Sequence, residues 1–122
     1  MKNQIIVLKY TKNQEKRTVT ENAPEGSLLD YMYEEIGCDL VQCVSFNGFD
    51  AWVDEEGLFK KNPMYTYTDE DGNEAVFTGN IIFTKGIDNE GNTTFFDTEE
   101  DADIIMQITR MISNAKFFNR NS

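Results

Sequence analysis

The stretch LVQCVSFNGFDAWV, residues Leu40–Val53, is typical of two antiparallel strands joined by a tight turn. Asn47-Gly48 is a favoured two-residue turn, because both residue types tolerate the positive φ angles that such a hairpin requires. The aromatic and β-branched residues on either side of it have high strand propensity. The stretch therefore predicts strands at residues 40–46 and 49–53, and an antiparallel sheet built around them.

Strand-like patterns also occur before and after this hairpin. Asn62-Pro63 breaks the chain, so residues 64–68 fit either a short strand or a turn. Gly79 interrupts a longer apolar run and suggests a bulge or a close backbone contact. The remaining predicted strands are residues 5–10, 16–21, 75–77, 80–84 and 93–96.

Two stretches have helical periodicity, at residues 27–36 and 98–115. In the first, Ser27 is the predicted N-cap and Gly37 stops the helix. Strands and helices together predict an α+β fold, with a curved antiparallel sheet of about five to seven strands and two helices. The length of 122 residues fits a single domain covering 1–122.

The second predicted helix has two apolar sides. Thr98 is its predicted N-cap, with Asp101 in the capping-box position. A smaller outer patch includes Met106, Ala102 and, if the helix continues, Phe117, and such a patch suits self-association or a partner. The main stripe, which we expect to cover the sheet, is Ile104, Ile105, Ile108, Met111, Ile112 and Ala115.

Charge is unevenly distributed along the chain. The formal net charge is −11, and 21 of the 22 acidic residues lie between residues 21 and 103. Such a field repels nucleic-acid phosphates, so we expect no direct binding to DNA or RNA. It attracts a protein with a basic surface. Solubility alone also explains an acidic surface, and a nucleic-acid mimic needs a dense row of carboxylates that a sequence does not show.

The residue types that carry much of enzyme chemistry are scarce. The chain has no histidine, which removes the usual general base and imidazole metal ligands. Cys38 and Cys43 alone cannot form a structural zinc site, and we expect both to be buried thiols that form no disulfide in a reducing cytoplasm. The sequence therefore predicts a cytoplasmic protein that is not an enzyme and has no cofactor, and no apolar run predicts a membrane span or a signal peptide.

A carboxylate-rich pattern occurs three times, as DEEG at residues 54–57, DEDG at 69–72 and DNEG at 88–91. Clustered carboxylates suit calcium, but an EF-hand loop needs glycine at its sixth position and glutamate at its twelfth. Here glycine is the fourth residue each time. Each pattern therefore predicts a type I turn with glycine in the left-handed conformation, and no metal site.

The carboxylates of the first two turns are the predicted contacts to a basic partner. Because exposed charges alone add little affinity, apolar anchors are expected beside them, on the C-terminal helix or just after it. The predicted protein-binding residues are Asp54, Glu55, Glu56, Asp69, Glu70, Asp71, Met106 and Phe117.

Several turn and strand motifs resemble a small domain family of unknown function that is carried by phages, plasmids and their bacterial hosts. The motifs are DEEGL at residues 54–58, Asn62-Pro63, GNIIF at 79–83, and Gly86-Ile87-Asp88 with Gly91. The resemblance covers residues 40–100. It implies an origin in a mobile element, and it supplies neither an activity nor site residues.

These observations predict a non-enzymatic, acidic accessory protein of a phage or mobile element, which binds a host or phage protein with a basic surface. A specific form of this hypothesis is a nucleic-acid mimic that inhibits a defence protein. The alternative is a self-assembling structural or regulatory module that uses the C-terminal helix as its homo-oligomer interface.

Overall fold

The computed structural model describes residues 1–10, 16–46, 48–60, 64–68, 72 and 74–118. No helix among these residues is long and apolar enough to cross a membrane. In chain order the elements are β1 (Gln4–Tyr10), β2 (Lys16–Asn22), α1 (Leu28–Ile36), β3 (Val41–Ser45), β4 (Phe49–Asp54), the 3₁₀ turn η1 (Gly57–Phe59), β5 (Met64–Thr68), β6 (Glu74–Thr78), β7 (Ile81–Ile87), β8 (Thr93–Thr94), α2 (Ala102–Asn114) and β9 (Lys116–Phe118).

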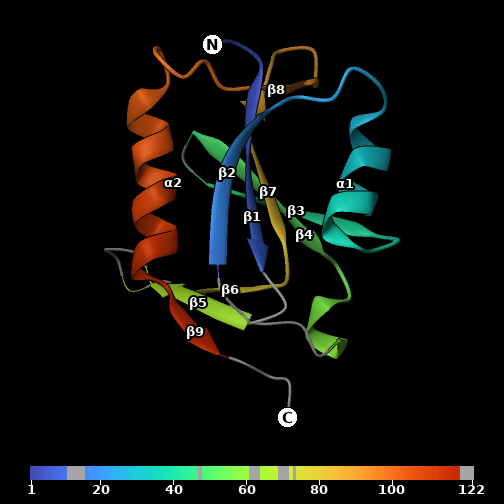
Figure 1. Cartoon of the computed structure of the whole chain (residues 1–122), viewed down its shortest axis with the longest axis vertical. Coiled ribbons are helices and arrows are strands. Elements are labelled where there is room, and N and C mark those ends of the chain that lie inside the picture. The colour runs from blue at the N-terminus through green and yellow to red at the C-terminus, as the bar shows by residue number, and fades with distance from the viewer. Residues whose placement is uncertain (11–15, 47, 61–63, 69–71, 73, 119–122) are drawn as a thin grey trace.

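A six-stranded antiparallel sheet forms the centre of the molecule (Figure 1). Its strand order is β2-β1-β7-β4-β3, with β8 also paired to β7. The predicted α+β class, the β1–β2 hairpin and the β3–β4 hairpin are confirmed. The predicted last strand at 93–96 is shorter: β8 ends at Thr94, and Phe96 forms an isolated bridge with Gln4.

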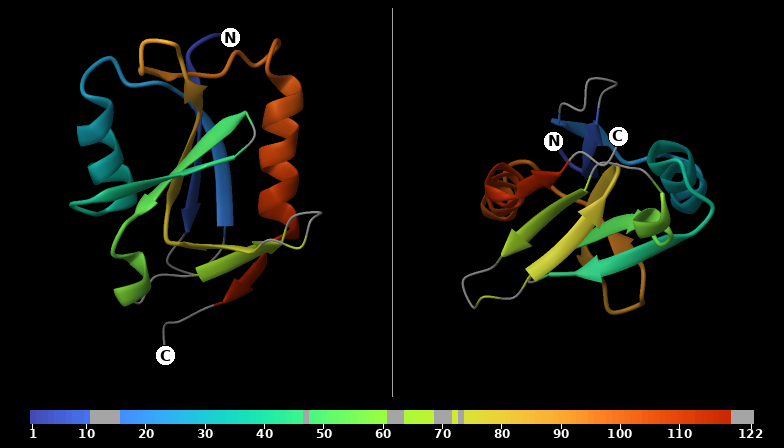
Figure 2. Two further views of the ribbon diagram at one scale, coloured as in Figure 1. Left: turned by 180° about the vertical axis from the view of Figure 1, so that it is seen from behind. Right: turned by 90° about the horizontal axis from the view of Figure 1, so that it is seen from below.

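The two helices cover opposite faces of this sheet (Figure 2). On one face, α1 packs Met32 and Ile36 against Ile5, Val7 and Ile82. The other face lies under α2 and a second, three-stranded sheet of order β6-β5-β9. Both faces of the central strands β1 and β7 are therefore buried, which explains their continuous apolar sequences.

The predicted ends of α1 are confirmed. The Ser27 hydroxyl accepts a hydrogen bond from the Asp30 N–H at 3.2 Å and caps the start. Gly37 has a φ of 77°, and its N–H donates to the Tyr33 carbonyl at 2.9 Å. This left-handed conformation strains a residue with a Cβ, so glycine ends the helix at low cost.

The predicted start of α2 is wrong. The helix begins at Ala102, because Thr98 is used elsewhere: its Oγ1 accepts from the Met1 amino group at 2.8 Å, and its N–H donates to the Met1 carbonyl. The predicted stripe is confirmed, since Ile108, Met111 and Ile112 are buried against the sheet. The helix ends at Asn114, so Phe117 does not extend it.

The second sheet was not predicted as a separate unit. Residues 64–68 do form a strand, β5, which pairs with β6 and with β9. Residues Lys116–Phe118 thus pair within their own domain, where Phe117 lies opposite Tyr65 in the ladder. This sheet closes the end of the core between α2 and η1 (Figure 2).

Candidate functional site

Three turns in the described chain share one local structure. In each, an aspartate Oδ1 accepts a hydrogen bond from the N–H of the glutamate two residues later. The pairs are Asp54 with Glu56 at 2.9 Å, Asp88 with Glu90 at 2.9 Å, and Asp97 with Glu99 at 2.8 Å. The aspartates therefore hold the turns, while the side chains of all three glutamates are exposed.

Asp54 does not face solvent, which corrects the prediction for this residue. Its side chain is only 3 % exposed, and its Oδ2 forms an ion pair with Lys60 Nζ at 2.7 Å. The carboxylate is thus neutralised inside the fold. Glu55 and Glu56 are exposed, as predicted, whereas the predicted residues Asp69, Glu70 and Asp71 lie outside the described residues.

The predicted left-handed glycine holds for two of the three turns. Gly72 and Gly91 have φ angles of 85° and 84°. Gly57 does not have a positive φ; it lies in η1, packed so tightly against Thr78 that a Cβ has no room. At Gly57 the requirement for glycine comes from close packing, which a local turn pattern does not indicate.

A second group of carboxylates gathers where the turn after β7 and the start of α2 lie at the same end of the molecule (Figure 1). The Met1–Thr98 hydrogen bonds tie the N-terminus to this end. We call this group, all of whose members are exposed, the acidic end: Asp88, Glu90, Glu99, Glu100 and Asp103.

Two further aspartates, Asp97 and Asp101, stabilise the backbone of the acidic end through hydrogen bonds. Asp97 accepts hydrogen bonds from the N–H groups of Glu99 and Glu100, and these bonds lower the pKa of its carboxyl group. Asp101 accepts from the Asp97 N–H at 2.8 Å and pairs with Lys85 at 3.0 Å. Lys85, a base at this end, is therefore already paired within the fold.

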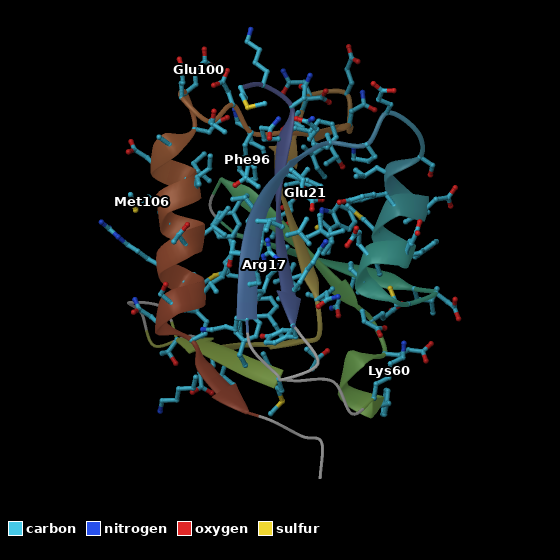
Figure 3. All side chains as sticks on the ribbon, viewed as in Figure 1. Arg17, Glu21, Lys60, Phe96, Glu100 and Met106 are labelled. Atoms are coloured by element: carbon cyan, nitrogen blue, oxygen red, sulfur yellow. The ribbon has the colours of Figure 1, made fainter. Side chains whose placement is uncertain are left out.

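The predicted carboxylates are separated from the acidic end. Figure 3 shows Glu100 and Lys60, the partner of Asp54, toward opposite ends of the molecule. Glu55 and Glu56 thus belong to the end that carries η1. The acidic end has a signal in the sequence, the DNEG pattern at 88–91 and the DTEED stretch at 97–101, but the second stretch also has the features of a helix start.

The predicted apolar anchors do not form one patch. Met106 is 51 % exposed and points outward from α2 (Figure 3). Phe117 lies on β9, opposite Tyr65, and is not on the helix. Sequence reasoning missed Ile87, which is 60 % exposed and directly precedes Asp88 at the acidic end.

A polar cluster lies near the turn of the β3–β4 hairpin. Asp50 is buried, and its Oδ2 has no hydrogen-bond partner in the described chain. Cys43 is a free cysteine but exposed, so the expectation of a buried thiol is wrong here and holds only for Cys38. The pKa of the Cys43 thiol is raised by desolvation and by the neighbouring Asp50 carboxylate. Trp52 Nε1 donates to Thr84 Oγ1 at 2.9 Å.

We expect Cys43 to be alkylated slowly by iodoacetamide at about pH 8, despite its exposure, because only the thiolate reacts. The rate should rise with pH through a midpoint above that of an ordinary cysteine. Asp50→Asn removes the neighbouring charge and should move the midpoint down. Peptide mass spectrometry follows Cys43 separately from Cys38, with Glu90→Gln as a remote control. An unchanged midpoint in Asp50→Asn would contradict the effect of the Asp50 carboxylate on the pKa of the Cys43 thiol.

Nothing in the described chain gathers three or more histidine, cysteine, aspartate or glutamate side chains in a geometry that could hold a metal ion. What the acidic end can do chemically is attract positive charge. Its carboxylates are close to the surface and in high dielectric, so the attraction acts mainly on the rate of encounter and on orientation.

Comparison with known proteins gives one finding. A family model described as "Domain of unknown function (DUF3846)" matches residues 1–112. The match covers β1 through most of α2, including the acidic end, and stops before β9. A search of curated proteins and a search of solved structures each find no match.

Proposed function

This chain belongs to the DUF3846 family of unknown function, and we propose that it is a non-enzymatic binding protein whose acidic end engages a basic surface of a protein partner. The observation that carries the proposal is that the aspartates and the glutamates of these turns have different roles. Asp88, Asp97 and Asp101 hold the backbone, and Glu90, Glu99 and Glu100 are exposed without an ion pair among the described residues.

Charge alone gives little affinity, because exposed ion pairs are screened by water and salt. A stable complex needs apolar area that loses water at the centre of the interface. Ile87 supplies such an anchor, since it is largely exposed and adjoins Asp88. The proposed site is therefore an apolar contact at Ile87, flanked by carboxylates that orient the basic partner.

The finer form of the proposal concerns origin and partner. The resemblance to domains of phages and plasmids supports an accessory role in a mobile element, acting in the cytoplasm of a bacterial host. The negative field supports the mimicry of nucleic acid against a defence protein. Competition distinguishes this form: duplex DNA should displace the protein from a partner that it binds as a mimic, and should leave any other partner bound.

The test compares two matched charge reversals, each at two consecutive glutamates after a turn-holding aspartate. Glu99→Lys/Glu100→Lys should lose the partner, and Glu55→Lys/Glu56→Lys should keep it. Each protein is immobilised and used to capture proteins from bacterial lysate at low and high salt, with identification by mass spectrometry. The proposal predicts a basic protein that is captured at low salt by the wild type and by the Glu55/Glu56 variant only.

The same experiment shows how the proposal fails. If every captured protein survives reversal at Glu99 and Glu100, the acidic end is not the binding surface. If capture is equally strong at high salt, charge is not what selects the partner. Circular dichroism of both variants guards against loss of fold as the cause.

A further inference from the structure

The strand β2 is an edge of the central sheet. Within the part of the chain that the structure describes, it stands at the end of the strand order and pairs with β1 on one side only. In Figure 1 it lies in front of β1, and in the right view of Figure 2 neither helix covers it. An exposed edge offers unpaired N–H and C=O groups to another strand.

Hydrogen bonds elsewhere in the sheet determine which groups of β2 are unpaired. The backbone N–H of Gln4 donates to the Phe96 carbonyl, and the N–H of Phe96 donates to the Gln4 carbonyl, each at 2.8 Å. The N–H and C=O groups of Gln4 therefore point away from β2. Gln4 and Asn22 are therefore a non-hydrogen-bonded pair, and the pattern alternates along the ladder. The residues whose N–H and C=O groups point outward from β2 are Lys16, Thr18, Thr20 and Asn22.

The sequence of β2, KRTVTEN, is complementary to itself when read in the opposite direction. Placing Val19 opposite Val19 of a second chain puts Thr18 opposite Thr20, and Arg17 opposite Glu21, twice. Threonine pairs and opposite charges are favourable across antiparallel strands. In this register the outward groups of Thr18 and Thr20 bond to each other.

We propose that β2 pairs with β2 of a second copy of this chain about a two-fold axis at Val19, joining the two central sheets into one. The axis is perpendicular to the sheet, so α1 of both copies lies on one face and α2 on the other. Such an interface is isologous and closes at two subunits.

The charged groups at the edge are arranged for this contact. Arg17 is exposed and has no ion pair among the described residues. Glu21 is fixed at the same edge, because the Tyr31 hydroxyl donates to its Oε2 at 2.7 Å and Lys9 lies 3.6 Å from its Oε1 (Figure 3). Alternation along the strand places Arg17 and Glu21 on the face that carries α1.

The interface does not depend on the proposed function, although it has a consequence for it. Antiparallel pairing reverses the strand direction of the second copy, so the two acidic ends point away from each other. A dimer of this kind presents two binding surfaces to a partner. The C-terminal helix, the interface of the self-assembling alternative, takes no part in it.

The experiment is sedimentation of the purified full chain over a range of concentrations, in low salt. The proposal predicts a reversible dimer. Arg17→Glu and Glu21→Arg should each raise the dimer Kd by roughly tenfold or more, since each turns two attractions into repulsions. The double exchange Arg17→Glu/Glu21→Arg should restore dimerisation, which a change confined to the monomer would not do.

A backbone variant tests the register. Thr20→Pro removes an outward N–H that β1 does not use, so it should give a folded monomer, whereas Thr20→Ser should remain dimeric. Circular dichroism and thermal melting confirm that both are folded. A wild-type monomer at the highest concentration, a dimer that Thr20→Pro leaves intact, or an open-ended series of oligomers would each overturn the proposal.

Discussion

Phe83→Ala should lower the free energy of unfolding by about 3–5 kcal/mol. Phe83 lies on the central strand β7, is 0 % exposed, and has its ring edge toward Phe49 at 6.2 Å between centroids. Removing the ring leaves a cavity between β7, α2 and the second sheet, which a close-packed core refills only in part. Urea denaturation followed by tryptophan fluorescence measures the change.

The matched control is Phe59→Ala, the same deletion at the surface. Phe59 is 91 % exposed on η1, so its loss should change the stability by less than about 0.5 kcal/mol. Domains of this size are typically stable by about 5–15 kcal/mol, so the loss expected for Phe83→Ala is a substantial part of the total stability. A loss below about 1 kcal/mol would contradict the described core.

Gly57→Ala should lower the stability by about 2 kcal/mol, the second largest effect that we expect. A Cβ at this position would overlap the Thr78 hydroxyl oxygen and lie 3.1 Å from Thr78 Cβ and 3.5 Å from Asp54 Cβ. Rotating the Thr78 side chain would move the hydroxyl away, but the new methyl group would remain 3.1 Å from Thr78 Cβ, so the overlap is relieved only in part. Thermal melting should show a drop of several degrees.

Two variants separate close packing from the general effect of replacing glycine. Gly26→Ala, where nothing lies within 4 Å, should be neutral or slightly stabilising. In the Thr78→Ala background, Gly57→Ala should be much less harmful, because the hydroxyl is gone. Equal losses in both backgrounds would show that the strain at Gly57 has another source.

The parts of the fold that the sequence predicted are those with strong local signals. Ser27 and Gly37 bracket α1 because a hydroxyl cap and a left-handed glycine act within one turn of helix. The β3–β4 hairpin follows from the favoured turn sequence Asn47-Gly48 and from the high strand propensity of the residues on either side of it. The buried stripe of α2 follows from helical periodicity, which does not depend on where the helix begins.

The parts that escaped prediction depend on contacts between distant residues. Thr98 has the local features of an N-cap, yet its hydroxyl bonds to the N-terminus, 97 residues away in sequence. Strand β9 exists because the β5 edge is there to receive it. Asp54 is buried because Lys60 reaches it, a pairing that no turn pattern specifies.

The candidate site, like the fold, was predictable only where the signal is local in the sequence. The sequence identified the carboxylate-rich turns and their excess of negative charge. It did not separate the aspartates, which bind the backbone, from the glutamates, which are exposed, and it did not show that Glu90 and Glu99 lie at one end of the molecule while Glu55 lies at the other. Which side chains of a turn bind its backbone, and which are exposed, can be determined only from the three-dimensional structure of the turn.

The most direct test of the central claim is the affinity for a captured partner, measured by titration calorimetry at several salt concentrations. The wild type and Glu55→Lys/Glu56→Lys should bind with similar affinity, and both should weaken steeply as salt rises. Glu99→Lys/Glu100→Lys should bind more weakly and with a shallower dependence on salt. Identical salt dependence in all three proteins would contradict the claim that the acidic end meets the partner.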